Sequence, residues 1–147
     1  MFTEENLAFV NSITGILRIE LSEAATPSAP HMLNLQASPN AKLVSLRFEA
    51  SMSDEDYEPV PFTDAELKRV VFEGPSLCLR GDTGDPVNID APGGEHFTLA
   101  ELLVAIERAE LETRGASTWL GGVDVHHIFF EGIFPEEDGT WSIGWGS

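Results

Sequence analysis

WLGGVDVHHIFFEGIFPEEDGTWSIGWGS, residues 119–147, contains all three tryptophans of the chain and no lysine or arginine. Its first part, residues 123–134, is rich in β-branched and aromatic residues, which favours a strand. Residues 135–139, PEEDG, have turn chemistry, because proline fixes φ and glycine permits a positive φ. Residues 140–145 alternate large apolar with small side chains, as half-buried strands do. The segment therefore predicts a β-hairpin that ends the fold.

The aromatic side chains of this hairpin are expected to share one face. A period of two residues places Ile128, Phe130 and Phe134 together on the first strand. They would meet Trp141 and Trp145 across the strand pair, where each aromatic pair contributes roughly 0.2–1 kcal/mol. Two interpretations stay open: these aromatics form the core, or they form an exposed recognition surface.

Three segments begin with phenylalanine and threonine in a pattern typical of helix starts, at residues 2–7, 62–67 and 97–102. The first predicts a helix over about residues 4–14, with Thr3 as its N-cap. In the other two, the threonine and the glutamate three residues later form a capping box. The second start predicts a short helical turn that leads into a strand.

The third start opens the clearest helix, which is expected over residues 98–114. Glu110 and Arg114 lie four residues apart in the order that stabilises a helix, and Arg114 lies near the negative end of the helix dipole. The apolar residues of this segment recur at helical spacing: Leu99, Leu102, Leu103 and Ile106.

Further strands are expected from alternating apolar and polar residues. In residues 42–50, the alternation directs Val44, Leu46 and Phe48 inward. The other expected strands are residues 16–21, 67–72 and 76–80, with a short edge strand at 32–36. Residues 81–94 have mostly turn composition, and Asp82–Asp90 offers a weak option for a cation without matching a calcium loop.

Strands outnumber helices and are mostly joined by short turns. The sequence therefore predicts a single α+β domain over residues 1–147. Its sheet is expected to be mostly antiparallel, with one long helix (98–114) packed on one face, an N-terminal helix, and a β-hairpin at the end. The single cysteine, Cys78, excludes an internal disulfide, and its leucine neighbours predict a buried thiol.

The net charge of −17 is the most extreme property of the sequence. It argues against nucleic acid and anionic membranes as partners, because both are bound through positive surfaces. It permits a basic protein partner, whose approach such a field accelerates. The alternative is that the acidity serves only solubility or reflects a saline habitat.

Residues 1–5 resemble no signal peptide, and no apolar run is long enough to cross a membrane, so we expect a cytoplasmic protein.

Two acidic clusters with a nearby aromatic residue are the predicted partner-binding residues. Charged rims around aromatic anchors are a common way of capturing protein partners. The first cluster is Asp54, Glu55, Asp56, Tyr57 and Glu58, and the second is Glu136, Glu137, Asp138 and Trp141.

A metal-assisted or acid–base enzyme is the alternative function, centred on Asp124, His126, His127 and Glu131. On a strand, Asp124 and His126 share one face, and His127 and Glu131 share the other. Neither face supplies the three protein ligands of a catalytic zinc site, so no metal or cofactor is predicted. The sequence has no nucleophile elbow, phosphate loop, HExxH motif or paired CxxC motif. Binding is therefore favoured over catalysis.

In size and charge alone, this chain resembles the bacterial immunity proteins and inhibitors that neutralise basic nuclease toxins. The resemblance implies an acidic module that binds and inhibits a basic protein. The partner's identity and the oligomeric state are left open by the sequence.

Overall fold

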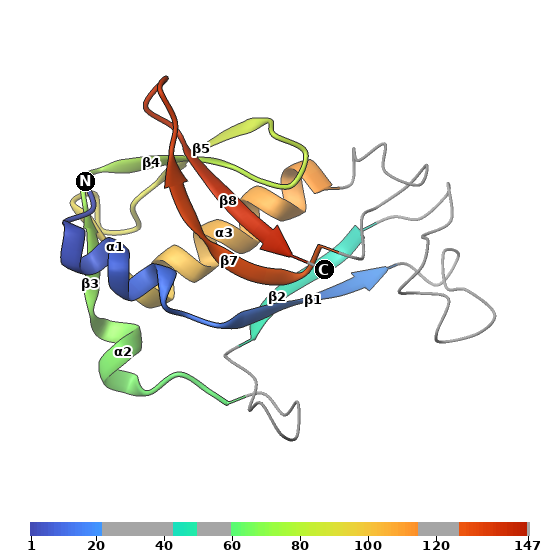
Figure 1. The fold of residues 1–147 in the computed structure, drawn as a ribbon, viewed down its shortest axis with the longest axis horizontal. Helices are drawn as coiled ribbons and strands as arrows, with labels where there is room; N and C mark the ends of the chain where they lie inside the picture. The colour runs from blue at the N-terminus through green and yellow to red at the C-terminus, as the bar shows by residue number, and fades with distance from the viewer. Residues whose placement is uncertain (22–42, 50–59, 115–126, 147) are drawn as a thin grey trace.

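The computed structural model describes residues 1–21, 43–49, 60–114 and 127–146 (Figure 1). Its elements, in chain order, are α1 (Glu4–Asn11), β1 (Gly15–Leu21), β2 (Leu43–Glu49), α2 (Asp64–Lys68), β3 (Val70–Glu73), β4 (Ser76–Arg80), β5 (Pro86–Asp90), β6 (His96–Thr98), α3 (Leu99–Thr113), β7 (Phe129–Pro135) and β8 (Trp141–Gly146). The expected edge strand at 32–36 lies outside these residues, as do Trp119 and residues 123–126 of the hairpin segment. None of the helices in the described ranges is long and apolar enough to cross a membrane.

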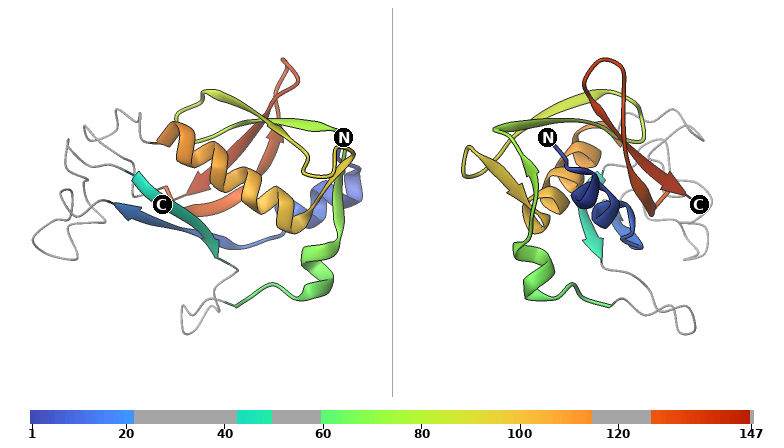
Figure 2. Two further views of the ribbon diagram at one scale, coloured as in Figure 1. Left: turned by 180° about the vertical axis from the view of Figure 1, so that it is seen from behind. Right: turned by 60° about the vertical axis from the view of Figure 1, so that its left-hand side comes forward.

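Six strands form the main sheet in the order β2-β1-β7-β8-β4-β5, and β3 and β6 form a small second sheet. All described strand pairs are antiparallel except β4 and β8, which run parallel. Helix α3 crosses one face of the main sheet, and α1 lies at one end of it (Figures 1 and 2). The predicted α+β fold, with a mostly antiparallel sheet and one long helix on one face, is thus confirmed.

The core lies between α3 and the main sheet. Its fully buried side chains include Leu17, Leu79 and Ile133 from the strands, and Leu99, Leu102 and Ile106 from the helix. Both predicted capping boxes are present: Thr63 pairs with Glu66 in α2, and Thr98 pairs with Glu101 in α3. Local hydrogen bonds therefore start these helices, and burial of an apolar stripe stabilises the longer one.

The predicted C-terminal hairpin is confirmed as β7 and β8, but the shared face of its aromatics is not. Phe130 pairs with Trp145 across the strands, and their ring centroids lie 5.8 Å apart. Phe134 instead lies on the opposite face and is 46% exposed. The register shifts between Phe130 and Gly132, so Glu131 is an extra residue that reverses the alternation after it.

Two other expectations about side-chain direction were wrong. Val44 is 57% exposed rather than inward. The ladder between β1 and β2 shifts register beside it, from Ser45 to Leu43, so Val44 is left outside the alternation. Cys78 is half-buried rather than a core thiol, because the side chains of Leu77 and Leu79 occupy the inner face of β4.

Helix α1 ends at Asn11 rather than near residue 14, and the side chain of Asn11 supports β7. Strand β1 pairs with β7 only at Gly15 and Ile16. Further along β7, the side chain of Asn11 takes the place of the backbone of β1 as the hydrogen-bond partner. Its Oδ1 accepts from the backbone N–H of Ile133 at 2.8 Å, and its Nδ2 donates to the Ile133 carbonyl at 3.2 Å. One amide side chain thus satisfies both backbone groups where the ladder opens.

Replacing Asn11 with alanine should lower the free energy of unfolding by about 1–3 kcal/mol, because it leaves a buried donor and acceptor of Ile133 without their partner. Urea unfolding measures the effect. Ser12→Ala is the matched control, since the Ser12 side chain is exposed and bonds only within its own helix turn, to the Phe9 carbonyl. Equal losses in the two variants would show that Asn11 does not support β7.

Candidate functional site

Arg80, the last residue of β4, connects the loop 81–85 that follows β4 with the hairpin turn 136–140 that precedes β8. Leu79 pairs with Trp141 and Arg80 pairs with Ser142, so the end of β4 meets the start of β8. The turn projects beyond the neighbouring strands (Figures 1 and 2). Four exposed carboxylates lie on these two segments, and we call them the acidic tip: Asp85, Glu136, Glu137 and Asp138.

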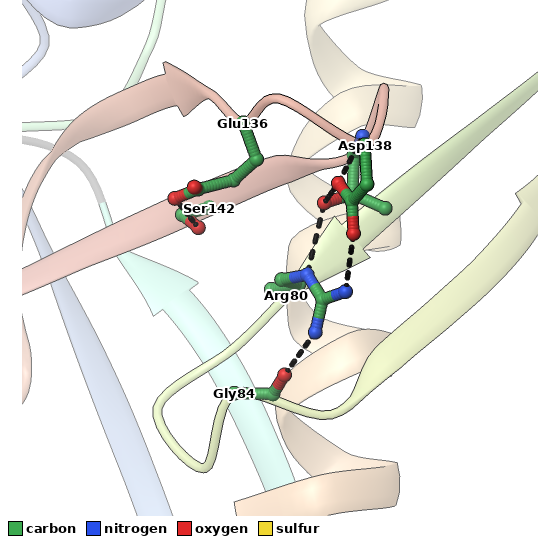
Figure 3. A network of polar contacts seen from close by, with 6 residues as sticks. Arg80, Gly84, Glu136, Asp138 and Ser142 are labelled. Carbon is green, nitrogen blue, oxygen red and sulfur yellow. Dashed lines mark hydrogen bonds and ion pairs between the residues drawn. The ribbon is translucent and has the colours of Figure 1, made fainter.

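Arg80 joins the loop to the turn through all three nitrogens of its guanidinium group (Figure 3). Its Nε donates to Thr140 Oγ1 at 2.9 Å, and its Nη2 donates to Asp138 Oδ2 at 2.6 Å. Its Nη1 donates to the carbonyl of Gly84 at 2.7 Å. A planar guanidinium holds such a set of acceptors in fixed directions. The tip is therefore held in one geometry.

Asp138 is the most strongly stabilised carboxylate of the tip. Hydrogen bonds from the Thr140 hydroxyl and backbone, followed by the one from Arg80, lower the pKa of Asp138 to about 2. Glu136 accepts from the Ser142 hydroxyl at 2.6 Å, and Glu137 is exposed. The turn consequently presents a fixed negative charge at neutral pH.

A buried ion pair holds the same loop from inside. Glu110 and Arg114 of α3 are both completely buried, with Glu110 Oε2 3.4 Å from Arg114 Nε. The Glu110 carboxylate accepts from the backbone N–H of Asp82 at 3.0 and 3.2 Å. The Arg114 guanidinium lies over the Trp145 ring, 5.4 Å from its centroid. The pair thus connects α3 to the loop and to β8.

Gly81 permits this close approach. A Cβ atom at Gly81 would lie 2.7 Å from Glu110 Oε2, closer than any side chain tolerates without movement. The side chain of Asp82 contacts His127, with Asp82 Oδ1 3.8 Å from Nδ1 of His127. That distance allows an ion pair if the imidazole is protonated, but it exceeds a hydrogen bond. Thr83 Oγ1 is buried and has no hydrogen-bond partner among the described residues.

The predicted partner-binding residues are brought together only in part. Glu136, Glu137 and Asp138 lie on the hairpin turn, as expected. Trp141 packs toward the core, with its ring centroid 4.8 Å from that of Phe2. Residues 54–58 lie outside the described residues.

The residues of the alternative enzymatic function are described only in part. His127 lies against Asp82, and Glu131 lies over the backbone of Gly144 and Gly146. Asp124 and His126 are outside the described residues. Within the described ranges, no three histidine, cysteine, aspartate or glutamate residues gather in a group that could hold a metal ion.

Sequence reasoning missed the roles of Arg80, Asp82 and the buried pair. The four-residue spacing of Glu110 and Arg114 predicts a pair that stabilises the helix, but it does not by itself predict burial. Their positions carried a signal, because they continue the helical spacing of Leu103 and Ile106 onto the buried face. A charged pair that falls on an apolar stripe indicates a buried ion pair.

Removal of Glu110 should strongly destabilise the fold. Glu110→Ala leaves the buried charge of Arg114 without this carboxylate, a change that costs about 3–5 kcal/mol in comparable buried pairs. The double variant Glu110→Leu with Arg114→Met should recover part of that loss, because both charges are then absent. Chemical denaturation of the single and double variants measures both effects.

The matched control is Glu112→Ala, which removes an exposed pair with the same spacing on the same helix. Arg108 Nε lies 3.1 Å from Glu112 Oε1, and both side chains are exposed. Such pairs contribute roughly 0–1 kcal/mol. Losses of equal size for Glu110→Ala and Glu112→Ala would contradict a structural role of the buried pair.

Acid should weaken the turn through Asp138. The pKa of Asp138 is lower in the folded protein, about 2, than its ordinary value of 3.8. Its contribution is therefore fully present above pH 3.8 and is lost as the pH falls toward 2. The difference in unfolding free energy between the wild type and Asp138→Asn should shrink over that range. A difference that stays constant with pH would contradict this role.

No family model, curated protein or solved structure matches this chain. A functional assignment therefore depends on the chemistry of the side chains themselves. The features available for it are the acidic tip, the Arg80 contacts and the buried pair behind the loop.

Proposed function

We propose that this protein binds a basic protein partner through the acidic tip. The supporting observation is a projecting turn with three consecutive acidic residues, Glu136–Asp138, held to the neighbouring loop by Arg80. Binding orders the groups that make contact, and a turn that is already fixed loses less conformational freedom. A fixed acidic turn is therefore a better docking surface than a mobile acidic segment of equal charge.

The charge of the whole chain supports the same function. A net charge of −17 extends an attractive field toward a cation well beyond the contact surface. Fields of this kind raise association rates by about 10- to 1,000-fold, and salt weakens them. The tip supplies the local geometry, and the remaining carboxylates supply the attraction at a distance.

An immunity or inhibitor protein is the specific form of this proposal. Its partner would be a basic protein whose active surface is covered by the acidic tip. The size and acidity of the chain and the fixed turn support this form. These features indicate that the partner is a basic protein.

A second candidate function, acid–base chemistry near residues 124–131, is favoured by one observation. The imidazole of His127 lies beside the carboxylate of Asp82, and the loop carrying Asp82 is held by the buried Glu110. An imidazole positioned by a carboxylate is a common arrangement for proton transfer. His127→Ala would abolish an enzymatic activity but leave capture of a basic partner intact.

Neutralising the tip should slow association with the partner. The test variant combines Asp85→Asn, Glu136→Gln and Glu137→Gln, which leaves Asp138 and its contacts with Arg80 in place. A basic protein first captured at low salt serves as the partner, and its association rate is measured by stopped-flow mixing. We expect the rate to fall about tenfold for the variant, and to fall for the wild type as salt is raised to about 0.5 M.

The matched control removes the same charge elsewhere, by Glu4→Gln, Glu5→Gln and Asp64→Asn on the exposed starts of α1 and α2. It should slow association much less than the tip variant. Equal effects of the two variants would show that only net charge matters. Association that does not respond to salt would overturn the proposed function.

A further inference from the structure

Strand β5 (Pro86–Asp90) ends the main sheet, and no described strand lies beyond it. Its bonds to β4 continue with the Ala91 N–H donating to the Pro75 carbonyl at 2.8 Å. Because hydrogen-bonded pairs alternate in an antiparallel ladder, Val87 and Ile89 point their backbone groups toward β4. Asn88 and Asp90 therefore point theirs outward. Pro86, without an N–H, suits such an edge.

An apolar groove runs between β5 and α3. Its volume is about 270 Å³, and its apolar lining includes Ile89, Phe97, Val104 and Ala105. Val104 is 61% exposed although it lies on the long helix of the core. Ile89 and Asp90 of the edge strand thus belong to the lining of the groove.

We propose that β5 accepts an extended, basic segment of the partner as an added strand, with an apolar side chain of that segment in the groove. This inference rests on the proposed function and specifies how the basic partner docks. Strand addition uses the backbone for affinity and adjacent side-chain sites for specificity.

The register of the added strand follows from the alternation of β5. Ile89 is buried and points to the face covered by α3, so the residue opposite it would point into the groove. Neighbours on the added strand would lie opposite Asn88 and Asp90, which are exposed on the outer face. A lysine or arginine opposite Asp90 would form a favourable cross-strand pair.

The charges around the groove favour a basic occupant. Glu101 lies at the groove, Asp90 is exposed on the outer face of β5 next to it, and Asp85 of the acidic tip immediately precedes β5. Arg108, the cation at the groove, is paired with Glu112 at 3.1 Å. A segment that alternates basic and apolar residues therefore matches both the carboxylates and the apolar lining.

The test uses an end-blocked peptide of alternating lysine and leucine as the probe and the full chain as the receptor. Val104→Lys should weaken binding about tenfold, because it adds a positive charge to the groove. Leu111→Lys is the matched control, since it makes the same charge change at another exposed position of α3, 42% exposed and outside the groove lining. It should change affinity by less than about threefold.

Backbone pairing is tested separately. A peptide with methylated backbone nitrogens keeps its charge and side chains, and it should bind about tenfold more weakly. On binding of the unmodified peptide, the Asn88 and Asp90 amides should gain protection from hydrogen exchange. Asn88→Pro removes one outward N–H and should also weaken binding. If this variant does not fold, the modified peptide still decides the question.

Equal effects of Val104→Lys and Leu111→Lys, or unprotected Asn88 and Asp90 amides, would overturn strand addition. Failure of the unmodified peptide to bind would overturn it too. The acidic tip would still stand as a binding surface if the tip variant slows association with the captured partner. If neither Asn88→Pro in β5 nor the tip variant slows association with the captured partner, the proposed function fails as well.

Discussion

The buried ion pair between Glu110 and Arg114 is the interaction on which the acidic end of the molecule depends. It lies in the core, where each charge needs the other. Glu110 also holds the Asp82 backbone, and Arg114 lies over Trp145. One helix turn therefore fixes both the loop after β4 and the last strand. Without such a contact, a loop of small and charged residues has little apolar surface to position it.

The parallel pairing of β4 and β8 brings the end of β4, where this loop begins, to the start of β8, where the hairpin turn ends. Arg80 then joins the two segments on their exposed side, while Glu110 holds the loop from within. A buried carboxylate and a half-buried guanidinium thus hold this loop together. This arrangement explains how a highly acidic surface segment keeps a defined shape.

The carboxylates of the described residues divide into distinct roles. Glu66 and Glu101 cap helices, and Glu110 supports a loop from the core. Asp138 keeps its charge further into acid than an ordinary aspartate, because hydrogen bonds from Thr140 and Arg80 lower its pKa. Asp85 and Glu137 are exposed and lie on the segments that Arg80 connects. Acidity therefore serves both architecture and, in our proposal, recognition.

The sequence by itself determined the local elements: the capping boxes at Thr63 and Thr98, the stripe of α3 and the PEEDG turn. Each depends on residues within a few positions of one another, so periodicity and turn chemistry suffice to predict it. Only the tertiary structure decided that a bulge turns Phe134 outward, that β8 pairs in parallel with β4, and that Glu110 and Arg114 are buried. These features depend on partners distant in the chain, and the free energy of burial selects them only when the whole core assembles.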